Sequence, residues 1–104
     1  MKKSKNFFAQ VYEEVKKIPE GKVMTYGQIA AKIGTKDARR VGDALHANKE
    51  GSGVPCHRVV NKDGRLAPSY AFGGYHEQRN RLLAEGVKFL DELRVDLTKC
   101  GCSD

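Results

Sequence analysis

Apolar residues in the first part of the chain recur at intervals of three and four positions. They are Phe7, Phe8, Val11, Tyr12, Val15 and Ile18. Side chains at these intervals lie on one face of a helix, so the pattern predicts an amphipathic helix over residues 5–17. Pro19 and Gly21 follow at once, and both residue types end helices.

Two shorter helices are predicted next. Thr25, followed three positions later by Gln28, fits a capping box, which starts a helix that Gly34 would end. A second helix is predicted from about Asp37 to Ala47. Its inner face would carry Ala38, Val41, Gly42 and Leu45. Its outer face would carry Arg39, Asp43 and His46, with Arg40 beside them.

Short ordered segments and turns alternate in the middle of the chain. After a polar loop, Pro55 holds the preceding residue extended, and the run to Val60 has strand character. Residues 61–64 are typical of a turn. Residues 67–74 form a loop whose glycines permit close approach of the backbone to a ligand.

A last helix is predicted from about residue 76 to 84, ended by Gly86. Apolar and polar residues alternate imperfectly over 87–97, so a small β-hairpin or an extended tail is expected there. The predicted fold class is therefore α/β (α+β): a small, mostly helical, winged helix-turn-helix-like domain with a minor sheet or hairpin.

The net charge of +6 lies entirely in the first half of the chain. Residues 1–49 carry eleven Lys/Arg and five Asp/Glu, whereas residues 50–104 carry eight of each. Two short helices around a glycine-containing turn, with arginines facing outward, are typical of a DNA-binding helix-turn-helix. The alternative is an ordinary helical hairpin with a solvated, charged face.

At 104 residues the chain is expected to form one domain, with its core at about 6–90 and a flexible tail at 98–104. No apolar run approaches the ~20 residues of a membrane span. The N-terminus lacks the apolar stretch of a secretion signal. We expect a monomer in the cytoplasm, associated with the nucleoid in a bacterium or archaeon, or in the nucleus of a eukaryote.

Three cysteines make an odd number, so a fully paired disulfide framework is excluded. Cys100 and Cys102 are expected to be reduced thiols in the tail. Two cysteines are too few ligands for a structural zinc site, so we do not expect them to bind metal. We predict neither a metal nor a cofactor. Cys56 stands beside His57, and an imidazole can favour the thiolate, which is the reactive form of cysteine.

The order of these motifs resembles the DNA-binding, active-site domain of the O6-alkylguanine-DNA alkyltransferase family and its small alkyltransferase-like relatives. The resemblance covers about residues 6–90. The matching segments are Ile-Pro-Glu-Gly-Lys-Val (18–23), Thr-Tyr-Gly-Gln-Ile-Ala (25–30), Ala-Arg-Arg-Val-Gly (38–42), Asn48, Val-Pro-Cys-His-Arg-Val-Val (54–60), Gly-Gly (73–74) and Leu-Leu-Ala-Glu-Gly (82–86).

The resemblance implies a role for each matching residue. Cys56 would take the alkyl group from guanine O6, His57 would draw the thiol proton through a water, and Glu85 would orient the imidazole. Asn48 would brace the turn before the active-site segment. The expected DNA contacts are Tyr26, Gln28, Arg39, Arg40, Leu45 and His46. The expected base pocket comprises Val54, Pro55, Val59, Tyr70, Phe72 and Gly73.

Two features depart from the family pattern. The alkyltransferase-like group usually replaces the nucleophile with tryptophan or alanine, whereas Cys56 is present here. Phe72 stands near the place where the family usually carries a serine that contacts the lesion oxygen.

Two functions therefore remain open. The first is a single-use methylated-DNA–protein-cysteine methyltransferase that binds the minor groove of duplex DNA, flips O6-alkylguanine and transfers its alkyl group to Cys56. The second is a non-catalytic lesion sensor that binds the same base and recruits nucleotide excision repair proteins. A plain helix-turn-helix regulator is a third interpretation, and a Cys-His hydrolase is poorly supported because no oxyanion motif is recognisable.

Overall fold

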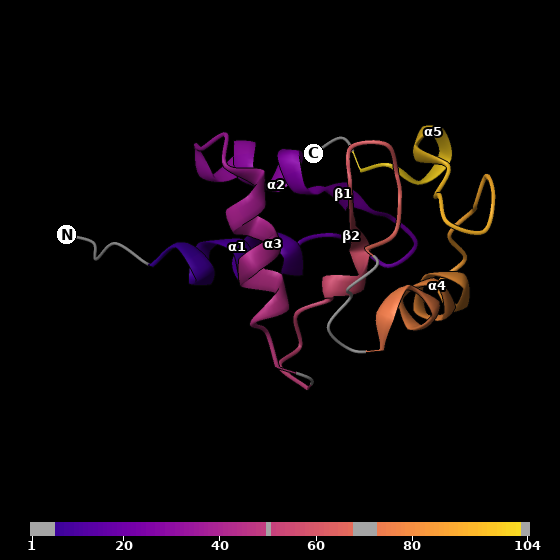
Figure 1. Ribbon diagram of the computed structural model, residues 1–104, viewed down its shortest axis with the longest axis horizontal. Coiled ribbons are helices and arrows are strands. Elements are labelled where there is room, and N and C mark those ends of the chain that lie inside the picture. The colour runs from indigo at the N-terminus through magenta and orange to yellow at the C-terminus, as the bar shows by residue number, and fades with distance from the viewer. Residues whose placement is uncertain (1–5, 50, 68–72, 103–104) are drawn as a thin grey trace.

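The computed structural model describes residues 6–49, 51–67 and 73–102 (Figure 1). The elements in chain order are α1 (Phe7–Lys16), β1 (Met24–Thr25), α2 (Tyr26–Ile33), α3 (Ala38–His46), a 3₁₀ turn η1 (Cys56–Arg58), β2 (Val59–Val60), α4 (Gly74–Ala84) and α5 (Leu97–Cys100). The expected small, mostly helical domain with a minor sheet is confirmed.

The first helix forms where the apolar spacing predicts it. The Asn6 side chain caps α1 by accepting a hydrogen bond from the Ala9 amide at 2.8 Å. Val11 and Val15 are fully buried, and Ile18 joins them just beyond the helix end. The helical face that carries these residues packs against α2 and α3.

The predicted capping box of α2 is confirmed. Thr25 Oγ1 accepts from the Gln28 amide at 3.1 Å, and Gln28 Oε1 accepts from the Thr25 amide at 2.8 Å. Gly34 ends the helix with φ of 96°, a conformation that favours glycine. The Asp37 side chain then caps α3, with α2 and α3 packed together as a helix-turn-helix.

The minor sheet consists of two short parallel strands, β1 and β2. Met24 pairs with Val59, and Thr25 pairs with Val60. Successive side chains of a strand point to opposite faces. Met24 and Val59 therefore enter the core formed with the first three helices, while Val60 enters a second core that includes Leu82, Val95 and Cys100. The strand pair joins the two cores.

The extended run predicted up to Val60 is wrong over Cys56–Arg58, where the chain forms a single 3₁₀ turn. The Arg58 amide donates to the Pro55 carbonyl at 3.0 Å, and the Cys56 amide donates to the Val54 carbonyl at 2.8 Å. Pro55, whose ring restricts its φ to −80° here, is the N-cap residue of this turn. Only residues 59–60 remain a strand, and the predicted turn at 61–64 is confirmed by a hydrogen bond from Gly64 to Asn61.

The fourth helix begins at Gly74, two residues before the predicted start, and ends at Ala84 as expected. Gly73 precedes it with φ of 121°, and a Cβ there would lie 2.9 Å from that of Glu77. Most of the predicted 67–74 loop lies outside the described residues. In the part of the chain that is described, no helix is long and apolar enough to span a bilayer.

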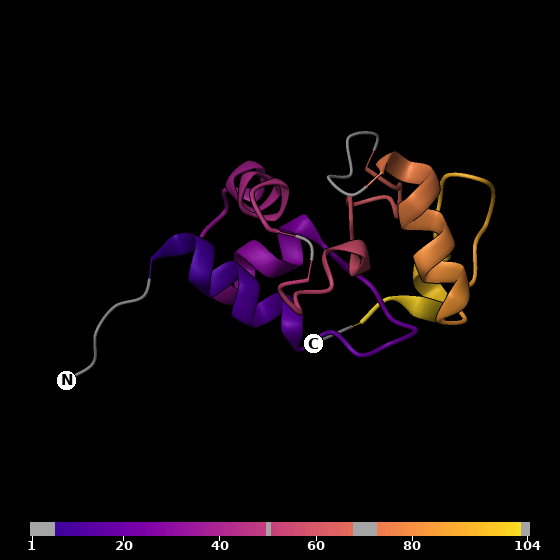
Figure 2. The ribbon, with the colours of Figure 1, turned by 90° about the horizontal axis from the view of Figure 1, so that it is seen from below.

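The C-terminal region is more ordered than the sequence indicates. Between 87 and 97 the structure has isolated antiparallel bridges, Phe89 with Val95 and Arg94 with Arg65, in place of a regular hairpin. Within the segment expected to be a flexible tail, α5 contributes the buried Cys100, and Gly101 bridges to Val23. In Figure 2 this yellow segment runs from α5 back towards the first half of the chain.

Candidate functional site

Cys56 is the first residue of the turn η1, and its side chain lies against the end of α3 and the residues that follow it. The Asn48 amide Nδ2 donates a hydrogen bond to Cys56 Sγ at 3.0 Å, and the thiol lies 3.9 Å from the Leu45 carbonyl oxygen. Asn48 Oδ1 in turn accepts from the Ser52 hydroxyl at 2.8 Å. Asn48 therefore connects the end of α3, the following loop and the sulfur, which is consistent with the bracing role expected for it.

The two residues after the cysteine share one carboxylate. His57 Nε2 lies 2.7 Å from Glu85 Oε2, and the Arg58 guanidinium donates to both oxygens of Glu85, through Nε at 3.0 Å and Nη2 at 2.8 Å. Arg58 also donates to the Ile18 carbonyl at 2.8 Å. This network joins the turn, the end of α4 and the end of α1.

Burial raises the pKa of the Cys56 thiol, and the hydrogen bond from Asn48 opposes that shift only in part. Burial, together with the positive charges of Arg58 and Arg81, lowers the pKa of His57 even though Glu85 favours the charged imidazole. Burial alone would raise the pKa of Glu85, but hydrogen bonds from Arg58 and His57 leave it below its usual value. At neutral pH the site therefore holds a thiol, a neutral imidazole and a carboxylate.

The neutral imidazole has a defined tautomer in this setting. Because Glu85 is a carboxylate, it accepts only, and His57 Nε2 must carry the proton that it donates. The remaining ring nitrogen, Nδ1, is then free to accept a proton. Within the described residues no hydrogen bond joins the thiol directly to the imidazole, because Cys56 contacts Asn48 and Leu45 instead.

A cavity of about 600 Å³ opens over the cysteine. It is lined by Tyr26, Ala38, Arg39, Gly42, Asp43, Leu45, His46, Cys56, Ala67 and Gln78. The start of α2, one side of α3 and Cys56 thus share one space, and that side of α3 includes Ala38, Gly42 and Leu45, which the sequence assigned to the inner face. Four of the expected DNA-contacting residues lie here with the expected nucleophile: Tyr26, Arg39, Leu45 and His46.

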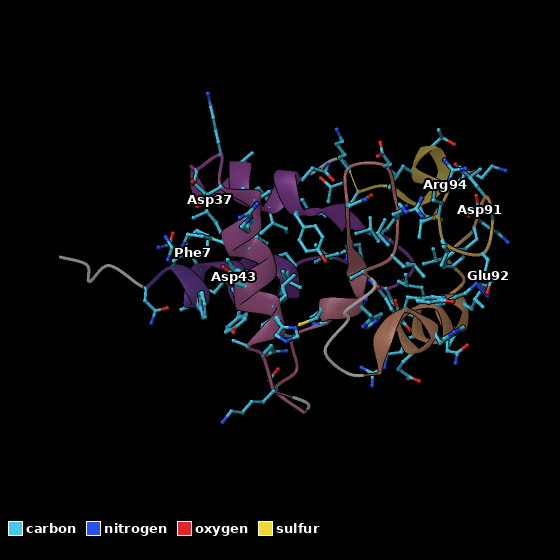
Figure 3. All side chains as sticks on the ribbon, viewed as in Figure 1. Phe7, Asp37, Asp43, Asp91, Glu92 and Arg94 are labelled. Carbon is cyan, nitrogen blue, oxygen red and sulfur yellow. The ribbon has the colours of Figure 1, made fainter. Side chains whose placement is uncertain are left out.

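Two expected DNA contacts are placed elsewhere. Both ends of the Gln28 amide are engaged within the protein: Oε1 accepts from Thr25, and Nε2 donates to the Cys102 carbonyl at 2.9 Å. Arg40 lies over the Phe7 ring, 4.2 Å from its centroid, on the side where Figure 3 labels Phe7 beside α1. Neither residue lines the cavity.

The expected base pocket is only partly described. Val54 and Pro55 are half-buried beside the cysteine. Val59 is almost fully buried in the core, and its carbonyl accepts from Gln78, so it does not reach the cavity. Gly73 caps α4, and Tyr70 and Phe72 lie outside the described residues.

Sequence reasoning missed Gln78, a fully buried polar residue of α4. Its Nε2 donates to the carbonyls of His57 and Val59 at 3.2 and 3.0 Å, and its Oε1 accepts from Ala67 at 2.9 Å. A glutamine in a charged helix gives no sign of burial, because the weak apolar periodicity of α4 does not mark its inner face. Arg58 was missed as well, since its partners are distant in sequence.

The described residues contain no group of three histidine, cysteine or acidic side chains arranged to hold a metal ion. The chemistry available at the site is that of a buried thiol, an imidazole with one accepting nitrogen, and a surface bearing arginine.

The fold and the site together define a class of protein: a small helix-turn-helix domain with a cysteine at the base of a cavity beside its second helix. The chain belongs to the O6-alkylguanine-DNA alkyltransferase family of DNA repair proteins. A sequence model described as the DNA-binding domain of 6-O-methylguanine DNA methyltransferase matches residues 6–87.

Relatives of two kinds are similar to the chain. The DNA base-flipping protein of Escherichia coli is 41% identical over 100 residues, covering 95% of this chain and 76% of that protein. The methylated-DNA–protein-cysteine methyltransferase of Saccharolobus islandicus is 45% identical over 86 residues, covering 79% of this chain but only 52% of that protein.

A solved structure extends the comparison. Schizosaccharomyces pombe Atl1, crystallised with damaged DNA containing O6-carboxymethylguanine, superposes with a TM-score of 0.86 and 34% identity. The match covers 94% of this chain and 95% of that one. The fold is therefore that of an alkyltransferase DNA-binding domain over nearly its whole length.

Proposed function

We propose that this protein binds duplex DNA from the minor groove, flips an O6-alkylguanine into its cavity and accepts the alkyl group on Cys56. One observation carries the proposal: Cys56 lines the same cavity as Tyr26 and Arg39, at the face of α2 and α3. A flipped base that enters between these helices and α4 would meet the cysteine. O6 inside an intact base stack could not reach it.

The DNA-binding part of the proposal rests on charge and exposure. Arg39 and His46 are exposed on α3, and the first half of the chain holds all of the net positive charge. A cation inserted into the stack offsets part of the cost of extruding the base, which is a few kcal/mol. We assign that insertion to Arg39, and we assign Tyr26 to the backbone beside the flipped nucleotide.

The proposed transfer is an in-line displacement at the alkyl carbon. The bond from carbon to guanine O6 breaks, and a bond from carbon to Cys56 Sγ forms. The thiol proton passes to His57 Nδ1 through one water and is returned to the departing guanine. Glu85 stabilises the imidazolium in between. The thioether has no group to regenerate it, so each molecule reacts once.

A second function is favoured by a specific observation. Burial raises the pKa of Cys56, so the unbound protein holds a protonated and poorly nucleophilic thiol. A protein that flips and holds the base without taking its alkyl group would need no thiolate. In that case we propose that the bound complex recruits nucleotide excision repair proteins.

Mass spectrometry separates the two functions. The protein is incubated with a duplex containing O6-methylguanine, and the peptide containing Cys56 is weighed. Transfer predicts a gain of one methyl group on that peptide and none in the Cys56→Ala variant, which should still bind the duplex. The Cys102→Ala variant is the matched control, because it removes a half-buried thiol outside the cavity. Tight binding with an unmodified Cys56 peptide would establish the sensor instead.

A further inference from the structure

The last described residues of the chain return to the element that carries Tyr26. We refer to residues 97–102 as the C-terminal clip. They lie beyond residue 87, where the match to the family's DNA-binding domain ends. The matches to the Escherichia coli base-flipping protein and to Atl1 extend further and cover 95% and 94% of this chain.

Backbone hydrogen bonds join the clip to the residues before β1. The Val23 amide donates to the Cys100 carbonyl at 2.9 Å, and the Cys102 amide donates to the Val23 carbonyl at 2.7 Å. Val23 and Gly101 form a parallel bridge. This isolated bridge stands directly before β1, the strand that pairs with β2.

A side chain extends the contact into α2. Gln28 Nε2 donates to the Cys102 carbonyl at 2.9 Å, while Gln28 Oε1 accepts from the Thr25 amide. The same amide group thus closes the capping box and holds the clip. Tyr26 lies between Thr25 and Gln28, as the first residue of α2, and lines the cavity with Cys56.

The clip has a steric requirement of its own. A Cβ added to Gly101 would lie 2.5 Å from the Leu97 carbonyl oxygen, which is too close for any side chain. Cys100, one residue earlier, is buried in the second core and accepts a hydrogen bond from the Lys88 amide at 3.1 Å. The path of the clip is therefore fixed at both residues.

We infer that the C-terminal clip is a positioning element for the damaged base, holding Tyr26 at the edge of the cavity through Val23 and the Gln28 amide. The inference rests on the proposed base-flipping function. Tyr26 is the residue assigned to the DNA backbone beside the flipped nucleotide, and it lies in the sequence between the clip's two hydrogen-bond partners, Val23 and Gln28.

Two variants of the full chain test this role. Gln28→Glu keeps an oxygen to accept from Thr25, so the capping box survives, but it places an acceptor against the Cys102 carbonyl. Gly101→Ala disrupts the clip without touching α2. The matched control is Ala31→Glu, which adds the same charge at an exposed position of α2. Circular dichroism confirms that each variant is folded.

The measured quantities are the Kd for a duplex with O6-methylguanine and the fluorescence of a 2-aminopurine reporter of flipping. Both clip variants should weaken damaged-duplex binding and the flipping signal roughly 5–10-fold relative to the control, since about one hydrogen bond is lost. Binding to undamaged duplex should match the control. Variants that bind and flip like the control would overturn the inference.

A double-mutant cycle isolates the route through Tyr26. In a Tyr26→Ala background the clip variants should have little further effect, and fully additive losses would contradict the inference. Hydrogen exchange of the protein without DNA separates a failure of the clip inference from a failure of the proposed base-flipping function. If the unaltered protein shows no preference for damaged duplex, the proposed function fails. The clip is then judged by whether Gln28→Glu speeds amide exchange at residues 24–28, and unchanged exchange would reject it.

Discussion

Glu85 receives hydrogen bonds from His57 at 2.7 Å and from Arg58 at 2.8 and 3.0 Å. Glu85→Gln removes the charge that would stabilise an imidazolium but keeps an oxygen to accept. We expect the rate of alkyl transfer to fall about 10–100-fold while the Kd for damaged duplex stays unchanged. Single-turnover transfer measured beside binding checks this. Glu92→Gln, at the far end of the molecule in Figure 3, is the control.

The pH dependence of Cys56 reactivity follows from burial of its thiol. Since burial raises the pKa of Cys56, the thiolate fraction of the free protein should keep increasing above pH ~8.5, the value of an ordinary cysteine. Alkylation of Cys56 by iodoacetamide, followed by mass spectrometry, should show a midpoint above that value. Asn48→Ala removes the hydrogen bond that favours the thiolate and should move the midpoint higher. A midpoint below 8 would contradict the electrostatic picture.

The stability of the protein should fall in acid. The pKa of His57 is lower in the folded protein than in the unfolded chain, so the unfolded chain binds more protons as the pH drops below about 6.5. The lowered pKa of Glu85 acts in the same direction below about pH 4.5. Urea unfolding should give a free energy that declines from pH 7 to 4. The decline between pH 6.5 and 5 should shrink in His57→Gln, with His76→Gln as the control for an exposed histidine.

At the scale of elements, α4 is attached to the cysteine turn by Gln78. Gln78→Leu would leave the carbonyls of His57 and Val59 and the amide of Ala67 buried without their partner. We expect the free energy of unfolding to fall by about 2–4 kcal/mol, because unsatisfied buried groups cost about 1–3 kcal/mol each and are not fully additive. Denaturant titration measures this, and Asn80→Ala, exposed on the same helix, should be close to neutral.

The elements that sequence reasoning placed well are those with local signals. The capping box of Thr25 and Gln28 and the spacing of Val11 and Val15 act within one or two turns of helix. The sequence did not indicate that η1 is a 3₁₀ turn, because a short run after proline is equally compatible with a strand. The four-residue α5 carries no detectable periodicity, and its order comes from contacts with Val23 and Lys88.

At the scale of the molecule, the charge distribution determines how binding responds to salt. The excess positive charge lies in residues 1–49, so DNA binding should weaken steadily as salt rises. Arg39→Ala should weaken binding and reduce the slope of log Kd against log salt, because it removes one cation from the surface that displaces counterions from the duplex. Arg94→Ala, paired with Asp91 at the opposite end in Figure 3, should change the slope little. Equal effects would show that the whole surface, not α3, binds the duplex.

The sequence by itself determined the helix-turn-helix, the adjacent Cys56 and His57, and the basic half of the chain, because each depends on residues close together or on composition. Tertiary structure decided the rest. Glu85 reaches His57 across 28 positions, and Gln28 reaches Cys102 across 74. Whether such residues meet depends on how two cores pack around a two-stranded sheet, and the free energy of that packing is spread over many weak contacts that no short motif records.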